Sequence, residues 1–282
     1  MLNNTKRERN PMRAISISCA NFKGGVGKSS TTGLVGYNLA KMGKKVLIID
    51  FDAQANITSL LLKTKAANDD IITIDKSLMG AINEGIPLED IVISITDNLD
   101  LIPNAVDFSM YTRYLERNFD NEMNKVAFFK RLTEPLRTLY DFIFIDVPPT
   151  LSLLNDTAFY ACDQIVVVLQ TQERSLTGAE VFIEYLQNNL IDAFQSNVDI
   201  LGILPVLSKK GAIVDKEILK AAIEEFGENN IFENKISIME RVKRMDMTGI
   251  TDAPRDMHDR RVHEVFTGVA NEILERLEKV GK

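Results

Sequence analysis

Short runs of apolar residues recur along the chain, and longer stretches with helical spacing separate them. Five of these runs are uniformly apolar, which is the pattern of strands buried on both faces of a parallel sheet. They are the segments 14–20, 45–50, 141–146, 164–170 and 198–205. Strands that alternate with helices in this way predict a doubly wound α/β fold, with a mostly parallel sheet and helices on both faces.

The segment between residues 51 and 140 is too long for a single crossover connection. It contains a polar turn region, a short strand or hairpin and two helical stretches, which we interpret as insertions packed on the same domain. Their ranges are 68–76, 91–102, 107–118 and 124–139.

Apolar residues near the end of the chain follow a helical spacing from Val262 onward. They stand at 262, 265, 266, 269, 270, 273, 274 and 277. This spacing predicts an amphipathic helix that lies on the core. We therefore expect residues 14–282 to form one P-loop domain, preceded by a flexible basic arm at 1–13 that carries Lys6, Arg7, Arg9 and Arg13.

Composition narrows the class of protein. Hydrophobic residues make up 45% of the 282 residues, which is enough for a sizeable core. The net charge of −7 means that any nucleic-acid binding requires a local basic patch. Cys19 and Cys162 form no CxxC pair, so we expect two small buried residues. We expect no signal peptide and no transmembrane helix, and a cytoplasmic location.

A glycine-rich segment joins the first expected strand to the first expected helix, and it reads NFKGGVGKSS from Asn21 to Ser30. Its glycines let the backbone approach phosphate oxygens closely, and the following helix N-terminus adds to the attraction. Lys28 should reach the β and γ phosphates, Ser29 should bind Mg²⁺, and Ser30 should contact the α phosphate. The expected nucleotide-binding residues are Gly24, Gly25, Val26, Gly27, Lys28, Ser29 and Ser30.

The same segment departs from the common phosphate loop G-x-x-x-x-G-K-[ST] in two ways. Phe22 stands where that pattern has its first glycine, and Lys23 is an additional lysine. We interpret the loss of the glycine as a loop that presents Lys23 outward.

Three carboxylates close two of the expected strands. Asp50 and Asp52 follow the run VLII, and Asp146 follows FIFI. Because the carboxyl ends of parallel strands open on one crevice, we expect these groups to face the phosphate loop. Such carboxylates support Mg²⁺, often through water, or orient an attacking water.

Together these motifs resemble those of the ParA/MinD group of P-loop ATPases, over nearly the whole chain from Ala14. KGGVGKSS is similar to their deviant Walker A motif, which has the extra lysine. DFDAQAN is similar to the D-x-D-P-Q-G-N segment of ParA-type partition ATPases, and FIFIDVPPTLS to their Walker B strand. Ala53 and Ala55 depart from the family, which usually has Pro and Gly there. The resemblance is to the short partition ATPases, in which no helix-turn-helix domain precedes the loop.

The resemblance implies a role for each matching residue. Lys28 corresponds to the phosphate-loop lysine, and Lys23 to the lysine that reaches the nucleotide of the other subunit in a dimer. Asp52 corresponds to the carboxylate that orients the hydrolytic water, and Asp146 to the aspartate that supports Mg²⁺. Asp50 closes the same strand as Asp52 and is expected to support the metal shell. The catalytic candidates are Lys23, Lys28 and Asp52, and the metal candidates are Ser29, Asp146 and Asp50.

The resemblance also implies an ATP-dependent DNA partition protein that segregates a plasmid or a chromosome. ATP and Mg²⁺ would drive homodimerisation and nonspecific DNA binding on the nucleoid. A centromere-binding adaptor, of the ParB type or the ribbon-helix-helix type, would stimulate hydrolysis. DNA phosphates require a basic patch, and residues 235–261 carry seven basic and five acidic groups. The DNA-binding candidates are Arg241, Lys243, Arg244, Lys209 and Lys210.

Three alternatives stand beside this interpretation. A MinD-like positioning ATPase attaches to membranes through a basic amphipathic helix, whereas the last helix here carries Glu264, Glu272, Glu275 and Glu278. An iron–sulfur reductase of this fold requires cluster-ligating cysteines. An ATP-dependent ligase requires a substrate pocket that the sequence does not identify. His258 and His263 show no metal-ligand spacing, so we expect surface or helix-capping roles for them.

Overall fold

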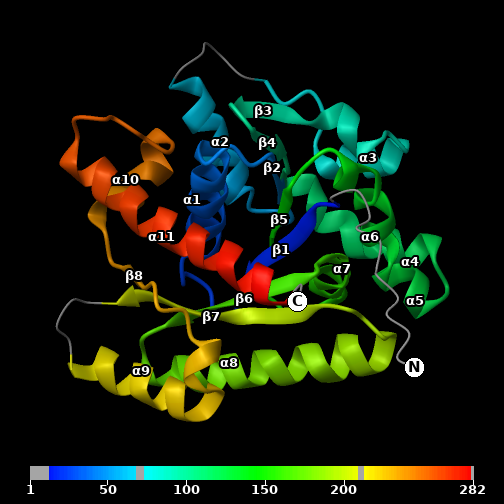
Figure 1. The fold of residues 1–282 in the computed structure, drawn as a ribbon. Coiled ribbons are helices and arrows are strands. Elements are labelled where there is room, and N and C mark those ends of the chain that lie inside the picture. The colour runs from blue at the N-terminus through cyan, green and yellow to red at the C-terminus, as the bar shows by residue number, and fades with distance from the viewer. Residues whose placement is uncertain (1–12, 68–72, 209–212, 281–282) are drawn as a thin grey trace, which may run out of the picture.

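The computed structural model describes residues 13–67, 73–208 and 213–280. In this part of the chain, one sheet has the strand order β3-β4-β2-β5-β1-β6-β7-β8 (Figure 1). Neighbouring strands are parallel except for β3 and β4. The strands are β1 (Ile15–Ala20), β2 (Val46–Asp50), β3 (Ile93–Thr96), β4 (Leu99–Ile102), β5 (Phe142–Asp146), β6 (Gln164–Gln170), β7 (Asp199–Ser208) and β8 (Ile236–Ser237). The expected doubly wound, mostly parallel sheet is therefore confirmed.

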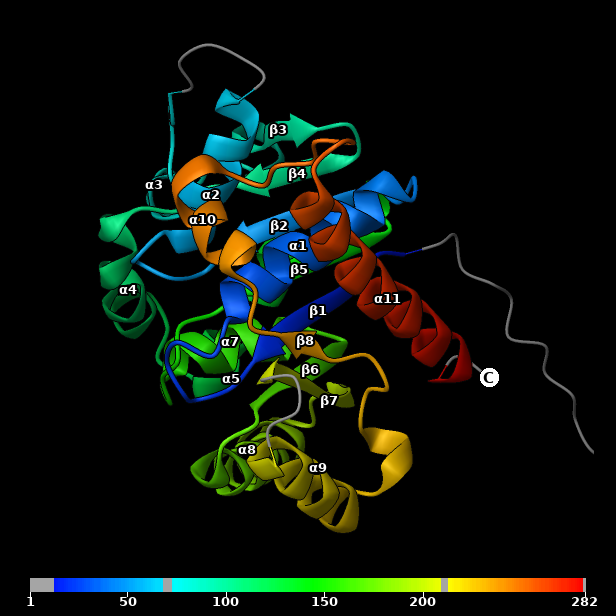
Figure 2. The ribbon, with the colours of Figure 1, turned by 90° about the vertical axis from the view of Figure 1, so that its left-hand side faces the viewer.

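Helices cover both faces of this sheet (Figure 2). The α-helices are α1 (Lys28–Lys41), α2 (Asn56–Ala66), α3 (Leu78–Glu84), α4 (Tyr111–Asn118), α5 (Glu122–Val126), α6 (Phe128–Thr133), α7 (Leu153–Ala161), α8 (Glu173–Leu186), α9 (Ile213–Phe226), α10 (Glu240–Thr248) and α11 (Met257–Val280). Shorter 3-10 or π turns are η1 (Leu88–Ile91), η2 (Val106–Met110), η3 (Pro135–Thr138), η4 (Gln187–Asp192) and η5 (Glu228–Asn230).

The two faces of the sheet carry two separate hydrophobic cores. On β5, Phe142 and Phe144 join the core beneath α1, α2, α10 and α11. Ile143 and Ile145, which point the opposite way, join the core beneath the helices α3 to α9. Because both faces of the strand are buried, apolar residues occupy every position of its run, which explains the uniform pattern in the sequence.

The insertions between residues 51 and 140 pack on this sheet. The expected hairpin is present as β3 and β4, which pair antiparallel at the edge. The stretch 107–118 forms η2 and α4, but 124–139 is divided among α5, α6 and η3. Pro135 begins η3, and since proline has no amide hydrogen, it cannot continue the hydrogen bonding of α6. Residues 68–72 of the expected polar turn lie outside the described residues.

The expected amphipathic helix is α11, which crosses α1 and packs against it (Figure 1; Figure 2). Its residues Val262, Phe266 and Ile273 are buried in the core, as the spacing predicts. His263 is also buried, so the expected surface or capping role is wrong for this residue. Its ring nitrogens lie 3.2 Å from Asn38 Oδ1 on α1 and 2.9 Å from the Thr251 carbonyl.

The first twelve residues, with Lys6, Arg7 and Arg9 of the expected basic arm, lie outside the described residues. Arg13 is described, and it forms an ion pair with Glu134. Cys19 and Cys162 are both buried, as expected. Within the described ranges, none of the helices combines the length and apolar character that crossing a membrane requires.

Candidate nucleotide site

The glycine-rich segment connects the C-terminal end of β1 to α1. Gly25 and Gly27 have φ angles of 71° and 84°, a region that side-chain-bearing residues rarely adopt. Gly27 precedes α1 without a side-chain cap, so the amides of the first helical turn are available to an anion. The backbone therefore has the conformation that a phosphate-binding loop requires.

Lys28 begins α1 and is 6% exposed. Its Nζ donates a hydrogen bond of 3.1 Å to the Lys23 carbonyl. Burial lowers the pKa of Lys28, while the nearby carboxylates of Asp146 and Asp52 raise it. The ammonium group thus lies close to two of the three carboxylates that the sequence predicts for the site.

Asp146 ends β5 and is the register partner of Asp50 on β2. It is 1% exposed, and its Oδ1 is buried without a hydrogen-bond partner among the described residues. Burial and the neighbouring Asp50 raise the pKa of Asp146 to about 8, against the opposing effects of Ser29 and Lys28. A buried carboxylate oxygen without a partner, close to Ser29, is suited to support a divalent cation.

The described residues hold no group of three His, Cys, Asp or Glu side chains that could bind a metal alone. In phosphate loops Mg²⁺ takes most of its ligands from phosphate oxygens and water, with one or two protein groups. Ser29 and Asp146 fit that smaller contribution.

Asp50 differs from Asp146 because both of its carboxylate oxygens have hydrogen-bond partners. Its Oδ1 accepts a 3.0 Å bond from the Asp52 amide, and its Oδ2 accepts bonds of 3.0 and 2.6 Å from the amide and hydroxyl of Thr58. Burial raises its pKa to about 6, and these hydrogen bonds oppose that rise. Asp50 therefore ties the end of β2 to the first turns of α2.

Asp52 lies in the loop between β2 and α2 and is partly exposed. Its Oδ1 accepts a 3.0 Å hydrogen bond from the Gln54 amide, and its carbonyl accepts one from Asn104. Ala55, later in this loop, has φ 53° and ψ 36°. A left-handed residue at this point explains why a glycine is usual there in the family that the sequence resembles.

Lys23 lies across the beginning of α8 of its own chain. Its Nζ donates a 2.6 Å hydrogen bond to Gln172 Oε1 and lies 3.3 Å from Ser175 Oγ. No motif in the sequence predicted a role for Gln172 or Ser175. The available signal was their position, because they follow the C-terminal end of β6 at the same edge as the phosphate loop.

The DNA-binding candidates differ in their surroundings. Arg241 forms ion pairs with Asp256 and with Asp259, whose side chain is fully buried. Burial tends to raise the pKa of Asp259, but hydrogen bonds from Arg241, Ala253 and Thr251 lower it to about 2. Arg241 thus holds together the segment that joins α10 to α11.

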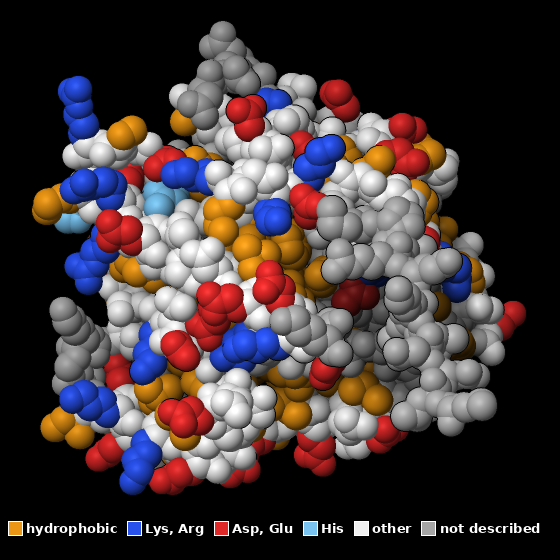
Figure 3. Space-filling model, viewed as in Figure 1, with side chains coloured by type: hydrophobic (Ala, Val, Ile, Leu, Met, Phe, Trp, Pro, Cys, Tyr) orange, Lys and Arg blue, Asp and Glu red, His pale blue; other side chains and the backbone are white. Residues whose placement is uncertain are grey.

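Other basic residues of this region are exposed. Lys243 pairs with Glu240 on the surface, and Arg244 is exposed. Arg255, Arg260 and Arg261 are also exposed. Lysine and arginine side chains gather over α10 and the beginning of α11 (Figure 3). Lys209 and Lys210 lie outside the described residues.

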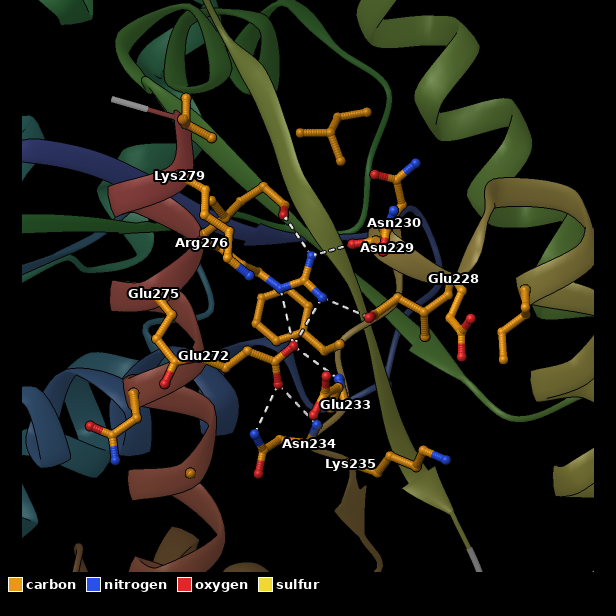
Figure 4. Close-up of a pocket in the computed structure, with 18 of the residues that line it drawn as sticks. Glu228, Asn229, Asn230, Glu233, Asn234, Lys235, Glu272, Glu275, Arg276 and Lys279 are labelled. Carbon is orange, nitrogen blue, oxygen red and sulfur yellow. Dashed lines mark hydrogen bonds and ion pairs between the residues drawn. The ribbon is translucent and has the colours of Figure 1, made fainter. Parts of the chain in front are cut away.

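A hollow of about 1170 Å³ lies at the opposite end of the strands, beside the C-terminal half of α11 (Figure 4). At its centre Arg276 donates hydrogen bonds to Glu272 and to the carbonyls of Asn229 and Ile231. Its guanidinium carbon also lies 4.2 Å from the ring centre of Phe232. Glu272, one of the acidic residues that the sequence analysis set against membrane attachment, is therefore buried and paired. These groups satisfy one another, so we assign the hollow a structural role.

A strand, a glycine-rich loop and a helix that begins with a buried lysine, beside an aspartate at the end of a neighbouring parallel strand, define a P-loop nucleotide-binding fold. Residues 12–200 match a family model described as an AAA domain. The sporulation initiation inhibitor protein Soj of Bacillus subtilis is 34% identical over 163 residues, which cover 57% of this chain and 60% of Soj. The chain belongs to this AAA-domain family, among its ParA-type members.

Solved structures agree with this fold. A variant of McdA from Cyanothece in complex with ATP has a TM-score of 0.77 and 22% identity, covering 93% of this chain and 97% of McdA. A putative plasmid partition protein from Borrelia burgdorferi B31 bound to AMPPNP has a TM-score of 0.74 and 22% identity, covering 95% of this chain and 99% of that one.

Proposed function

We propose that the chain is a Mg²⁺-dependent ATPase that dimerises around ATP and partitions DNA. The observation that carries this proposal is that Lys28 lies close to Asp146, whose Oδ1 has no hydrogen-bond partner among the described residues, and to the partly exposed Asp52. Lys28 also contacts the backbone of Lys23. Two similar structures with ATP and AMPPNP support the choice of nucleotide.

Each of the residues around the phosphate loop has a separate role in the proposed reaction. Lys28 and the loop amides bind and orient the phosphates, and Ser29 with Asp146 would hold Mg²⁺. When bound, this ion neutralises charge on the phosphoryl group. Asp52 accepts a hydrogen bond from the attacking water and orients it. Asp50 positions the Asp52 backbone through its bond to that amide.

Dimerisation would place a second copy on the edge that carries the phosphate loop. Three apolar side chains are exposed on segments that leave this edge: Val106 and Met110 after β4, and Leu151 after β5. Burying them against a second copy would favour association. In this dimer Lys23 would leave Gln172 and contact the partner's nucleotide, so the γ phosphate would control assembly.

DNA binding would use the exposed basic residues of α10 and the start of α11. We assign this role to Lys243, Arg244, Arg255, Arg260 and Arg261, and a structural role to Arg241. A centromere-binding adaptor of the ParB or ribbon-helix-helix type would stimulate hydrolysis, and the protein would act in the cytoplasm on the nucleoid. Phosphate contacts of this kind give binding that weakens steeply with salt.

The test is a titration of the protein against a random-sequence DNA duplex with ATP, with ADP and without nucleotide, at several salt concentrations. We expect binding only with ATP, and a shallower salt dependence in the Arg244→Ala variant. Arg113→Ala, which removes an exposed arginine from α4, is the matched control and should bind as the unmodified protein does. Nucleotide-independent binding contradicts the proposal, and ATP-dependent binding to anionic vesicles without DNA binding favours the MinD-like alternative.

A further inference from the structure

We propose that Asn21 and Phe22 are positioning residues that fix the backbone of Lys23 between β6 and α8, while its side chain stays free to leave Gln172. This inference rests on the role proposed for Lys23 in the ATP-bound dimer. It also explains why this chain has Phe22 at the position where the common phosphate loop has its first glycine.

Asn21 connects the loop to the sheet. The residue follows β1 directly and is 3% exposed. Its Nδ2 donates a 2.7 Å hydrogen bond to the Val168 carbonyl on β6, and its Oδ1 accepts a 2.9 Å bond from the Lys23 amide. One buried side chain therefore holds the Lys23 backbone at a fixed place relative to β6.

Phe22 connects the same loop to α8. Its ring centre lies 4.8 Å from that of Phe182 and 5.3 Å from that of Tyr185, with interplanar angles of 84° and 85°. Such edge-to-face contacts are favoured between aromatic rings. Phe182 is fully buried and also packs on Phe159 of α7, so the ring of Phe22 rests on a rigid surface.

The two contacts act on Lys23 together. The Phe22 ring is held by residues in the second half of α8, while the Lys23 amine is bonded at its beginning, to Gln172 and Ser175. The Lys23 carbonyl accepts the hydrogen bond from Lys28 Nζ. A displacement of Phe22 would therefore move the backbone of Lys23, the next residue in the chain. A glycine at position 22 has no side chain with which to make this attachment.

The Phe22→Ala variant tests the inference. Binding of a fluorescent ATP analogue to the monomer, at low protein concentration, should stay within about twofold because the residues from Gly24 to Ser30 are unchanged. ATP-dependent dimerisation and kcat at saturating ATP should fall about tenfold or more, since displacing a reacting group by about 1 Å can cost about a hundredfold in rate. Phe22→Leu, which keeps much of the apolar volume, should recover most of both.

The matched control is Phe119→Ala. Phe119 is also partly buried, with its ring centre 5.1 Å from that of Phe128, but it follows α4 and has no contact with the loop. It should lower the melting temperature without changing dimerisation per folded molecule. A purely structural role for Phe22 predicts the same behaviour for both variants.

Lys23→Ala, measured in parallel, separates this inference from the proposed function. If Lys23→Ala dimerises and hydrolyses ATP normally, the proposed role of Lys23 is overturned, and this inference with it. If Lys23→Ala loses dimerisation while Phe22→Ala stays within twofold of the unmodified protein, only the positioning role is overturned.

A second pair of variants serves if Phe22→Ala does not fold. Tyr185→Leu removes one aromatic contact from the side of α8 and leaves the loop sequence intact. Tyr185→Phe keeps the ring and removes only the hydrogen bond to Asp156. Loss of dimerisation in Tyr185→Leu but not in Tyr185→Phe supports the inference, and equal behaviour of the two overturns it.

Discussion

Replacing Asp146 with asparagine should stabilise the protein in the absence of nucleotide and Mg²⁺, and the gain should grow with pH. The carboxyl group is 1% exposed, its Oδ1 has no partner among the described residues, and its register partner is another aspartate, Asp50. Ionising such a group in the folded state is unfavourable. An amide of the same shape has no charge to bury.

The pKa sets the direction and the size of the effect. Burial raises the pKa of Asp146 from 3.8 to about 8. A raised pKa means that the contribution to stability is fully present below 3.8 and is lost as the pH rises towards 8. The slope for one proton is about 1.4 kcal/mol per pH unit, so the free energy of unfolding of the asparagine variant should gain about 3 kcal/mol on the unmodified protein between about pH 5 and 7.5.

Urea denaturation of both proteins in EDTA, across this pH range, measures the difference directly. Asp50 is present in both proteins, and its effect on the pKa of Asp146 is part of the difference that the comparison measures. Asp97→Asn, which changes an exposed carboxylate in the turn between β3 and β4 and buries no charge, is the matched control and should change the free energy of unfolding by less than about 1 kcal/mol. A pH-independent difference for Asp146→Asn, or one that shrinks as the pH rises, would refute the reasoning.

Three further perturbations test separate contacts. Gln172→Ala removes a hydrogen-bond acceptor from Lys23, which should strengthen ATP-dependent dimerisation by about 1 kcal/mol, or roughly fivefold, in analytical ultracentrifugation; weaker dimerisation would contradict this. Ala55→Gly relieves a left-handed backbone and should raise the free energy of unfolding by about 0.5 kcal/mol, whereas a loss would show that the strain is absent. Arg241→Ala leaves a buried carboxylate unpaired and should lower the free energy of unfolding by about 3 kcal/mol. Lys243→Ala, at an exposed pair, should change it by less than about 1 kcal/mol, and equal losses would oppose this distinction.

The sequence was informative where one physical requirement dominates a position. Burial on both faces requires an apolar residue at each position of a strand such as β5, and a positive φ favours glycine at Gly25 and Gly27. Parallel pairing of β2 with β5 then brings Asp50 and Asp146 into register. These requirements act within one segment or between regular neighbours, so the pattern of residues is enough to predict them.

The sequence did not predict which side chains form hydrogen bonds and ion pairs across the tertiary structure. Asp50 and Asp146 both stand at the end of a strand. Asp50, however, accepts hydrogen bonds from the amide and hydroxyl of Thr58, which lies eight residues further along the chain. Arg241 counts as one positive charge in a basic segment, but its ion pairs to Asp259 and Asp256 depend on how the chain turns between α10 and α11. His263 is buried because α11 crosses α1 at Asn38. Such partners depend on tertiary packing, which no local pattern contains.

The unfavourable burial of two charges, on Asp146 and Lys28, gives the proposed ATP-dependent dimerisation a physical basis. Without nucleotide, burial acts against both charges, raising the pKa of Asp146 and lowering that of Lys28. In the proposed complex, Mg²⁺ would bring a positive charge to Asp146, and the phosphates would bring negative charge to Lys28. Ligand binding would therefore offset the free-energy cost of burying these two charges in the folded protein. Lys28 also bonds to the Lys23 carbonyl, and Phe22 anchors that stretch to α8. Ligand binding at Lys28 would therefore reach Lys23, the lysine proposed to act on the second subunit, through the hydrogen bond to its carbonyl.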